Sequence, residues 1–435
     1  MKREALEALQ VWRQNPERKP LIVRGARQVG KTWLMREFGR AAFAKTAYVS
    51  FFNNPGVAAV FDESYSRERI LMGLSAVSGV DITAGDTLII LDEIQEQPRA
   101  LEALKFFAEE MNDYPVVAAG SLLGVALHSG LSFPVGKVEF LDLYPLSFSE
   151  FLNAMGQTQL AELLATEDWK LIGAFSAEFE LWLKNYMYVG GMPEVVEFFS
   201  QSNDYGKVRA LQRTIVEQYQ ADFSKHIPAA QSTRTRMVWN SIPAQLAKEN
   251  KKFVFRDLKP GGRLKDFELS IEWLVDSGLL TRVFRVSKPA VPLKAFEKQS
   301  VFKLYLGDVG LLGALSDFPA AALFEGDSVF TEFTGALAEQ FVVQELVATS
   351  GITPYYFATD SGSYKVDFLI QDGVRVIPVE VKSGTNRRAT SLNYYRDKFN
   401  PELSIRFSVG KFAKNADLMD VPLYAVSALK NIAQW

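Results

Sequence analysis

One eight-residue segment near the N-terminus constrains the fold of this chain more than any other. A short apolar run, Leu21 to Val23, leads into it, and a helical pattern that begins at Trp33 follows it. The segment has a glycine at its first and sixth positions and ends in lysine and threonine: Gly25, Ala26, Arg27, Gln28, Val29, Gly30, Lys31 and Thr32. Such glycines let a loop backbone wrap around phosphate groups. The pattern G-x-x-x-x-G-K-[ST] between a strand and a helix predicts a phosphate-binding loop.

The side chains of this loop indicate a nucleotide and its metal ion as ligands. We expect Lys31 to reach the β- and γ-phosphates and the hydroxyl of Thr32 to ligate Mg²⁺. The backbone from Gly25 to Trp33 should face the phosphates, because the first turn of a helix offers unpaired N–H groups to an anion. The sequence therefore predicts ATP and Mg²⁺ as ligands of residues 25–33.

A second motif supplies the acidic half of this predicted site. Thr87 to Leu91 is an apolar strand pattern, and Asp92 and Glu93 follow it directly. Asp92 can hold the Mg²⁺ shell and Glu93 can polarise an attacking water molecule. Ligands of open α/β sheets bind at the carboxyl ends of strands, where both motifs would lie. We therefore predict an ATP-hydrolysing site with Lys31 and Glu93 as catalytic residues.

Composition limits the other classes of function. The chain has no cysteine and two histidines, His128 and His226, so disulfides, thiolate zinc sites and Ser-His-Asp hydrolysis are not expected. No apolar run approaches the roughly 18 to 20 residues that span a bilayer, and the N-terminus carries no signal-peptide pattern. We expect a cytoplasmic protein that does not bind membranes. At 435 residues the chain should form two to four domains.

Strand and helix patterns alternate in the first third of the chain, which predicts a doubly wound parallel sheet of class α/β. The expected strands are Leu21–Arg24, Thr46–Phe52, Thr87–Leu91, Val116–Ala119 and Val138–Leu141. Helical patterns then dominate up to about residue 228. A helix-helix-strand order follows, which is typical of a winged helix. The predicted domains are a P-loop core at 1–150, a helical lid at 151–228, a winged-helix-like domain at 229–318 and an α/β domain at 319–435.

The last predicted domain contains a second group of acidic residues. Glu339 lies on an expected helix, Thr334 to Thr349, and Asp367 lies on the strand that follows. The next strand carries Glu380 and Lys382, which point to the same face because strand side chains alternate. Antiparallel pairing across a turn at Asp372-Gly373 would bring Asp367 beside Glu380. Asp367 and Glu380 are therefore predicted to bind Mg²⁺ and, with Glu339 and Lys382, to act in phosphodiester cleavage.

Five motifs together resemble those of prokaryotic AAA-type ATPases, which are related to archaeal and STAND-like P-loop ATPases. They are Gly25–Thr32, Leu91–Gln95, Ala119–Ser121, Leu143–Phe148 and Gly190–Glu194. The resemblance implies that Ser121 fills the sensor position near the γ-phosphate and acts in catalysis. It implies that Lys137 stands where relatives carry arginine, unless Lys137 is an ordinary surface lysine. It leaves Arg27 and Arg99 as candidate finger arginines of a homo-oligomer, or as ordinary exposed arginines.

The C-terminal acids resemble the core of PD-(D/E)XK nucleases. Asp367 and Glu380-Val381-Lys382 correspond to the signature, Glu339 to the preceding helix acid, and Val366 replaces the proline. The resemblance implies a nuclease-like domain that acts on nucleic acid, with DNA favoured over RNA. Cations and aromatic residues further along the chain suit a phosphate backbone: Arg387, Arg388, Tyr394, Tyr395 and Arg396.

Two alternatives stay open at this point. The basic residues between Arg234 and Lys265 either contact DNA phosphates or belong to a packing unit. The C-terminal domain either acts on nucleic acid under the control of ATP hydrolysis, or is a catalytically inactive module that binds a partner in a nucleotide-switched scaffold.

Overall fold

The chain forms two compact units. The computed structural model describes residues 2–61, 65–120, 134–324, 331–383 and 390–434. The N-terminal unit comprises residues 2–144 together with 276–278, and the C-terminal unit comprises residues 145–275 and 279–434. The first predicted boundary, at residue 150, lies close to this division. The further predicted boundaries at 228 and 318 stay predictions.

The N-terminal unit contains a five-stranded sheet in the order β2-β3-β4-β1-β5, in which every pairing is parallel. Its strands are β1 (Leu21–Arg24), β2 (Lys45–Ser50), β3 (Thr87–Asp92), β4 (Val116–Ala119) and β5 (Glu139–Asp142). The continuous apolar runs predicted these strands because a sheet covered on both faces buries every residue of its central strands. All residues of β3 and β4 are indeed buried. The predicted parallel α/β sheet is confirmed.

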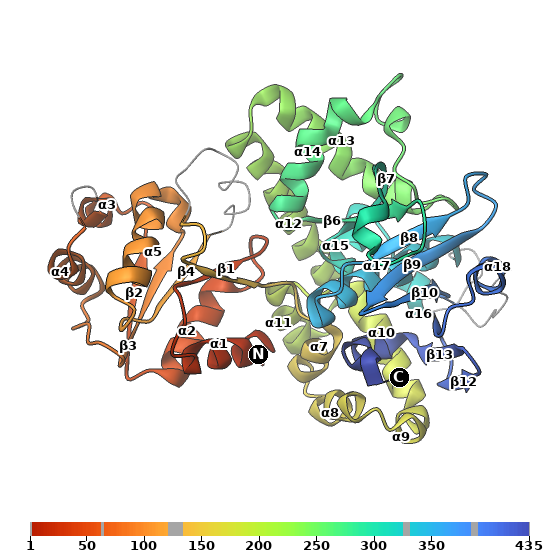
Figure 1. Cartoon of the computed structure of the whole chain (residues 1–435), viewed down its shortest axis with the longest axis horizontal. Helices are drawn as coiled ribbons and strands as arrows, with labels where there is room; N and C mark the ends of the chain where they lie inside the picture. Colours follow the sequence, from red (N-terminus) through yellow and green to blue (C-terminus); the bar gives the residue numbers. More distant parts are fainter. Residues whose placement is uncertain (1, 62–64, 121–133, 325–330, 384–389, 435) are drawn as a thin grey trace. The chain divides into compact units, whose positions relative to one another are not determined.

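Helices cover both faces of this sheet (Figure 1). They are α1 (Ala5–Gln14), α2 (Lys31–Ala42), α3 (Pro55–Phe61), α4 (Arg67–Ser78), the 3₁₀ helix η1 (Ile94–Glu96) and α5 (Pro98–Glu110). Helices α3, α4 and α5 share one buried apolar cluster with β2, β3 and β4. Helix α2 begins immediately after β1 and packs against β2, β3 and β4. The phosphate-binding loop thus lies between a buried strand and a packed helix.

The C-terminal unit begins with the helical region that the sequence predicted. Its helices up to residue 226 are α7 (Phe148–Ala154), α8 (Thr158–Thr166), α9 (Trp169–Ala174), α10 (Ser176–Val189), α11 (Pro193–Ser202) and α12 (Tyr205–His226). Ser147 caps α7 in a reciprocal capping box with Glu150, which fixes where this region starts. Whether these helices act as a lid stays a prediction.

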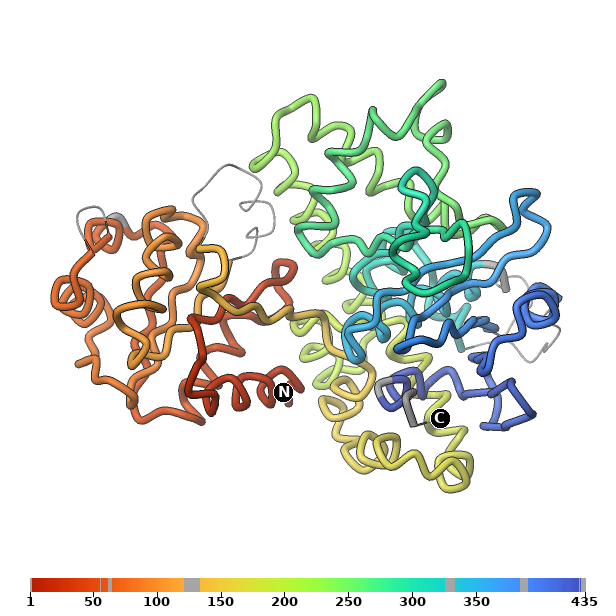
Figure 2. Tube along the Cα trace, in the orientation of Figure 1, coloured from red at the N-terminus to blue at the C-terminus, as the bar shows by residue number. Residues whose placement is uncertain are grey.

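The remaining strands form one mixed eight-stranded sheet in the order β12-β13-β11-β10-β9-β8-β6-β7. They are β6 (Leu280–Val286), β7 (Glu297–Leu306), β8 (Tyr355–Ala358), β9 (Lys365–Asp372), β10 (Arg375–Val381), β11 (Ser404–Ser408), β12 (Ala413–Asn415) and β13 (Leu418–Pro422). Figure 2 shows that chain segments far apart in the sequence, coloured from green to blue, meet in this sheet. Strand β6, which was expected as the wing, forms a hairpin with β7 and pairs with β8, and this hairpin forms one edge of the sheet.

The helices of the second half surround this sheet. They are α13 (Ala229–Leu246), α14 (Leu264–Asp276), α15 (Val309–Leu315), α16 (Ala321–Phe324), α17 (Thr331–Ser350) and α18 (Thr390–Phe399), with 3₁₀ helices η2 (Phe255–Asp257), η3 (Leu293–Phe296) and η5 (Leu423–Gln434). The chain order α17-β8-β9-β10-α18-β11 has β8, β9 and β10 antiparallel and β10 and β11 parallel. The predicted turn between β9 and β10 is present, with Gly373 at φ 56°. Residues 229–318 do not form a sheet of their own, and their winged-helix character stays a prediction.

Candidate nucleotide site and candidate acidic pocket

The loop from Gly25 to Thr32 has the backbone that its glycines predict. Gly25 has φ 142° and Gly30 has φ 93°, conformations that residues with a Cβ rarely adopt. A Cβ atom at Gly25 would lie 2.1 Å from the carbonyl oxygen of Leu143. Glycine is therefore required where the loop leaves β1. Trp33, in the first turn of α2, is 41% exposed and can contact a ligand from the loop's rim.

Lys31 folds back over this loop. Its Nζ donates hydrogen bonds to the carbonyl oxygens of Gly25, at 2.9 Å, and Ala26, at 2.7 Å. Burial lowers the pKa of Lys31 to about 8, although Glu93 and Asp92 oppose this shift. Phosphate oxygens are better partners for an ammonium group than neutral carbonyls are. The loop thus holds a desolvated cation that an anionic ligand would stabilise.

The two residues predicted to bind Mg²⁺ are in direct contact. The Thr32 hydroxyl donates to Asp92 Oδ2 at 2.7 Å, and the Tyr48 hydroxyl donates to the same oxygen at 2.9 Å. The backbone N–H of Glu93 donates to Asp92 Oδ1 at 3.0 Å. A hydroxyl and a carboxylate from a strand end are oxygen ligands of the kind that Mg²⁺ takes. Thr32 and Asp92 therefore fit the expected ion.

Two residues of this site had no signal in the sequence. Tyr48 lies on β2, and its hydroxyl reaches Asp92 across the parallel pair β2–β3. The guanidinium carbon of Arg36 lies 3.7 Å from the centre of the Tyr48 ring. Only the pairing of β2 with β3 brings these side chains to the acid. A strand order inferred from the sequence would have been needed to find them.

The other residues expected near this site have different outcomes. Ser121 lies outside the described residues. Lys137 pairs with Glu109 at 2.8 Å, and both side chains are exposed, which favours its role as a surface lysine. Arg99 lies 5.3 Å from the ring centre of Tyr65. The finger-arginine role of Arg27 or Arg99 stays a prediction.

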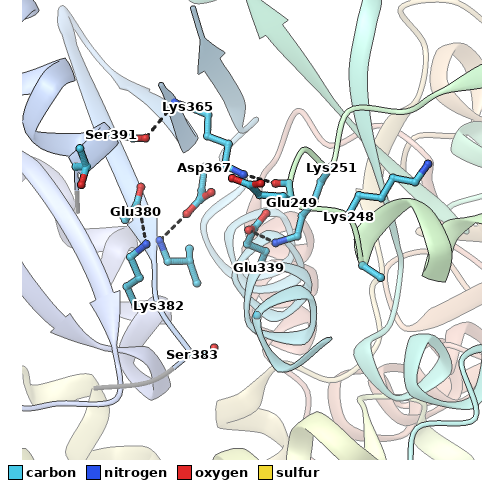
Figure 3. A pocket seen from close by; sticks show the side chains of 14 residues that line it. Lys248, Glu249, Lys251, Glu339, Lys365, Asp367, Glu380, Lys382, Ser383 and Ser391 are labelled. Atoms are coloured by element: carbon cyan, nitrogen blue, oxygen red, sulfur yellow. Dashed lines mark hydrogen bonds and ion pairs between the residues drawn. The ribbon is translucent and has the colours of Figure 1, made fainter. Parts of the chain in front are cut away.

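The C-terminal acids line a pocket of about 480 Å³ within the C-terminal unit. It is lined by residues of the segment after α13 and of α17, β9, β10 and α18: Ala247, Lys248, Glu249, Lys251, Gly335, Glu339, Lys365, Asp367, Glu380, Val381, Lys382, Ser383, Thr390 and Ser391. Figure 3 shows the acidic and basic side chains turned toward one another across this pocket. The structure thus brings together all four residues that the sequence selected here.

Asp367 and Glu380 lie side by side, as the predicted hairpin requires. The antiparallel register that pairs Val379 with Phe368 places Glu380 next to Asp367. Asp367 Oδ2 accepts a hydrogen bond from the N–H of Val381 at 2.9 Å, and Glu380 Oε1 pairs with Lys382 Nζ at 2.6 Å. Burial raises the pKa of both carboxyl groups. The Glu339 carboxylate raises the pKa of Asp367 further, and the Asp367 carboxylate raises that of Glu380 further. The pKa of Glu380 reaches about 7.

Glu380 Oε2 is buried and has no hydrogen-bond partner among the described residues. Two neighbouring buried carboxylates with an unpaired oxygen form a set that a divalent cation would stabilise. Asp367 and Glu380 therefore fit the expected Mg²⁺.

Glu339 is engaged differently from the other two acids. It pairs with Lys251, and its Oε2 contacts Lys303 Nζ at 3.3 Å and the Tyr305 hydroxyl at 2.8 Å. Burial alone would raise the pKa of Glu339, but the two lysines lower it to about 2. Within the described residues, no group of three or more histidine, cysteine or acidic side chains is arranged to hold a metal ion. This arrangement does not favour Glu339 as a metal ligand.

The residues around Glu339 were missed because they lie outside the predicted domain 319–435. Lys303 and Tyr305 belong to β7 and contact Glu339, whereas Lys251 follows α13 and lines the pocket, so only the packing of distant segments brings these groups to Glu339. The expected phosphate-binding surface downstream is only partly described, since Arg387 and Arg388 lie outside the described ranges. Tyr395 is buried, and Arg396 pairs with Asp417 at 2.5 Å, so both have packing roles.

The sheet order, the glycine loop and the Thr32–Asp92 contact define the N-terminal unit as a P-loop nucleotide-binding domain. A family model described as an AAA domain matches residues 17–152. The N-terminal unit is therefore a P-loop ATPase domain of the AAA type. Two further family models match residues 180–322 (DUF8612) and 334–424 (DUF4143), and both describe domains of unknown function. The nuclease-like character of the C-terminal part stays a prediction.

Among solved structures, the chain is similar to the Walker-type ATPase PABY2304 of Pyrococcus abyssi, at 12% identity and a TM-score of 0.46, over 72% of this chain and 95% of that one. It is also similar to the Aeropyrum pernix ORC1 protein in complex with DNA, at 16% identity and a TM-score of 0.28, over 74% and 92% of the two chains. A STAND protein with a tetratricopeptide repeat sensor, PH0952 of Pyrococcus horikoshii, matches at 13% identity and a TM-score of 0.29, over 80% of this chain and 47% of its own.

All three TM-scores are below 0.5, so the assignment rests on the family model and on the site itself. No curated protein sequence matches the chain significantly. Among the described helices, none combines the length and the apolar character needed to cross a membrane.

Proposed function

We propose that the N-terminal unit binds ATP with Mg²⁺ and hydrolyses it, and that this cycle controls a C-terminal pocket that acts on nucleic acid. The observation that carries the first part is the contact of Thr32 with Asp92 beside the folded-back Lys31. Lys31 and Asp92 are buried and held by hydrogen bonds, so these groups are positioned before a ligand binds. A transferring phosphoryl group needs little more than such positioning and charge stabilisation.

The residues of this site have separate tasks in the proposed reaction. The backbone N–H groups of residues 25–33 bind phosphate oxygens, and Lys31 exchanges its loop carbonyls for the β- and γ-phosphates. Thr32 and Asp92 would hold Mg²⁺, which would supply positive charge beside these phosphates. Glu93 accepts a proton from the water molecule that attacks the γ-phosphorus, while the bond to the β-phosphate oxygen breaks. Ser121, which lies outside the described residues, is proposed to contact the γ-phosphate as the sensor residue.

The substitution Glu93→Gln tests this part. We expect the variant to bind ATP and Mg²⁺ normally and to turn ATP over at least roughly 100-fold more slowly, because the amide cannot accept the proton. Glu96→Gln is the matched control, since Glu96 is exposed and lies three residues further along. ATP binding and hydrolysis by Glu93→Gln at the rate of the unmodified protein would refute the role of Glu93.

The C-terminal part of the proposal rests on the pairing of Asp367 with Glu380. These acids lie opposite each other on β9 and β10, and Glu380 Oε2 is a buried acceptor with no partner among the described residues. A cation held there would activate water and stabilise the departing oxygen of a phosphodiester. Lys382 lies on the same strand face as Glu380 and would orient that water. The pocket also carries lysines from other segments, namely Lys248, Lys251 and Lys365, whose charge suits a phosphate backbone.

Incubation with DNA and RNA tests this part, in the presence of Mg²⁺ or Mn²⁺, with and without ATP. We expect metal-dependent cleavage that is faster on DNA than on RNA. Each of the substitutions Asp367→Ala and Lys382→Ala should abolish this cleavage. Asp372→Ala is the control, because Asp372 pairs with Arg375 at the far end of the same hairpin. Cleavage that survives both substitutions contradicts the assignment of the pocket.

The absence of cleavage under every condition would favour the second candidate, a nucleotide-switched scaffold whose C-terminal unit only binds a partner. The observation that favours it is the set of lysine contacts around Glu339, which neutralise one of the acids. Homo-oligomerisation and a cytoplasmic location stay predictions under both candidates.

A further inference from the structure

The backbone reverses sharply where β3 ends at the two acids. Glu93 adopts the left-handed conformation, with φ 54° and ψ 42°. Such a conformation is strained for a non-glycine residue, and residues that keep it cluster at functional sites. The short helix η1 follows at once, closed by a hydrogen bond from Glu96 N to Glu93 O at 3.0 Å and anchored by the fully buried Ile94. The turn fixes the direction in which the Glu93 side chain leaves the strand.

Gln95, in the middle of this turn, holds the Glu93 carboxylate. Its Nε2 donates to Glu93 Oε2 at 2.5 Å. The orientation of the amide follows from chemistry, since only the NH₂ group can donate to a carboxylate. Gln95 Oε1 is buried and has no hydrogen-bond partner among the described residues. The amide group of Gln95 therefore donates to Glu93 through Nε2, and its Oε1 can accept a hydrogen bond from another donor.

The two adjacent acids have separate partners. Asp92 is fixed by the hydroxyls of Thr32 and Tyr48, whereas Glu93 receives the amide of Gln95. A neutral donor orients a carboxylate and leaves its negative charge in place. A lysine or arginine at this position would cancel that charge. The Glu93 charge also acts on Lys31, which Glu93 stabilises in its charged form more than Asp92 does. Glu93 thus lies close to the cation that is expected at the γ-phosphate.

We propose that Gln95 is a positioning residue for ATP hydrolysis, which holds Glu93 ready to accept the proton of the attacking water. The water oxygen bonds to the γ-phosphorus, the bond to the β-phosphate oxygen breaks, and the proton goes to Glu93. Gln95 Oε1 accepts the second O–H group of that water molecule. The inference rests on the proposed function of the N-terminal unit and deepens it.

The variants Gln95→Ala and Gln95→Glu test this inference in the full chain. For Gln95→Ala we expect kcat for ATP to fall roughly 10- to 100-fold, with the Kd for ATP changed by less than about threefold, because the residue aligns the base and does not bind the nucleotide. Gln95→Glu should be slower still, since an ionised carboxylate cannot donate a hydrogen bond to Glu93 and repels its charge. The acidic limb of its kcat profile should move to higher pH. Glu96→Ala, in the same turn, should leave all of these values unchanged.

The outcomes separate this inference from the function on which it rests. If Gln95→Ala keeps the unmodified kcat while Glu93→Gln is inactive, the ATPase assignment stands and the role of Gln95 is refuted. If Glu93→Gln hydrolyses ATP normally, the function itself is refuted. A fall in kcat that is accompanied by an equal loss of ATP affinity or by a lower unfolding temperature, with an unmoved pH profile, would mean a merely structural role and would overturn the inference.

Discussion

The nucleotide site and the acidic pocket both place carboxylates at strand ends, but they are assembled in different ways. The nucleotide site takes its groups from the loop after β1 and from the neighbouring strands β2 and β3 of one sheet. The pocket collects residues from five separate segments between Ala247 and Ser391. In the first site a lysine is held by backbone carbonyls, whereas in the second lysines are held by acids. A site built from neighbouring motifs of one sheet can form in an isolated domain. A site built from distant segments forms only when the whole unit is folded.

The largest difference between the two sites should appear when the chain is divided into fragments and the folding of each fragment is measured. We expect residues 2–144 to fold alone and bind ATP, and residues 145–435 to unfold cooperatively. Residues 319–435 alone should not fold, because β8 loses its neighbour β6 and Glu339 loses Lys251, Lys303 and Tyr305. Circular dichroism and urea unfolding of the three fragments measure this. Cooperative unfolding of 319–435 would show that the pocket is as self-contained as the nucleotide site.

The substitution Lys31→Ala should reduce ATP hydrolysis at the nucleotide site and leave the acidic pocket unchanged. We expect kcat/KM for ATP to fall by roughly 10²- to 10³-fold, because the phosphates lose their charged partner. Lys45→Ala is the matched control, since the side chain of the partly exposed Lys45 contacts only Asp81, with its Nζ 3.0 Å from the carbonyl oxygen and 3.4 Å from Oδ2, among the contacts described for it. Steady-state hydrolysis and nucleotide binding measure the effect. Equal activity of the two variants would remove Lys31 from the site.

Two lysines of the pocket should differ sharply in their contribution to stability. Lys251→Met breaks a buried pair with Glu339, which should lower the free energy of unfolding by about 3 kcal/mol. Lys248→Met breaks an exposed pair with Asp257 and should cost less than about 1 kcal/mol. Urea unfolding of both variants measures the difference. Similar costs would indicate that Lys251 is not an essential counter-ion of Glu339.

A further expected effect is a pH dependence of stability that arises in the C-terminal unit. Asp308 caps α15 and accepts hydrogen bonds from the N–H groups of Leu311 and Gly191. Burial raises its pKa from 3.8 to about 6, although these hydrogen bonds oppose the shift. The unfolded chain releases this proton near pH 4 and the folded chain only near pH 6. Stability therefore falls by about 3 kcal/mol as the pH rises through this window.

Asp308→Asn removes this titration. Its urea midpoint should be lower overall, because one amide oxygen cannot serve both N–H groups, but it should lack the slope between pH 4 and pH 6. A slope equal to that of the unmodified chain would assign the pH dependence to another group.

The sequence predicted what depends on local pattern and missed what depends on strand order. The continuous apolar runs predicted the strands of the parallel sheet, and the Asp372-Gly373 turn predicted the register that pairs Asp367 with Glu380. Side-chain alternation then placed Lys382 beside Glu380. All of these follow from periods and turns within about 20 residues, which the chain encodes directly.

The contacts of Tyr48, Lys251 and Lys303 were not predictable in the same way. Each arises because a strand or loop lies beside another that is distant in sequence, and one sequence does not state which strands pair. The junction of β6 with β8 was missed for the same reason. A strand pattern after two helices suggested a wing, but the parallel partner β8 forms hydrogen bonds with the edge of β6 that a wing would leave exposed.

The segment after α13 has a consequence for how the C-terminal unit responds to ligands. It forms one wall of the acidic pocket, where Lys251 pairs with Glu339 and the carbonyl of Glu249 accepts a hydrogen bond from Lys365 (Figure 3). Any ligand whose affinity depends on the position of this wall is thermodynamically linked to α13. By reciprocity, a partner that binds α13 and shifts the wall must change the affinity for that ligand by the same factor that the ligand imposes on the partner.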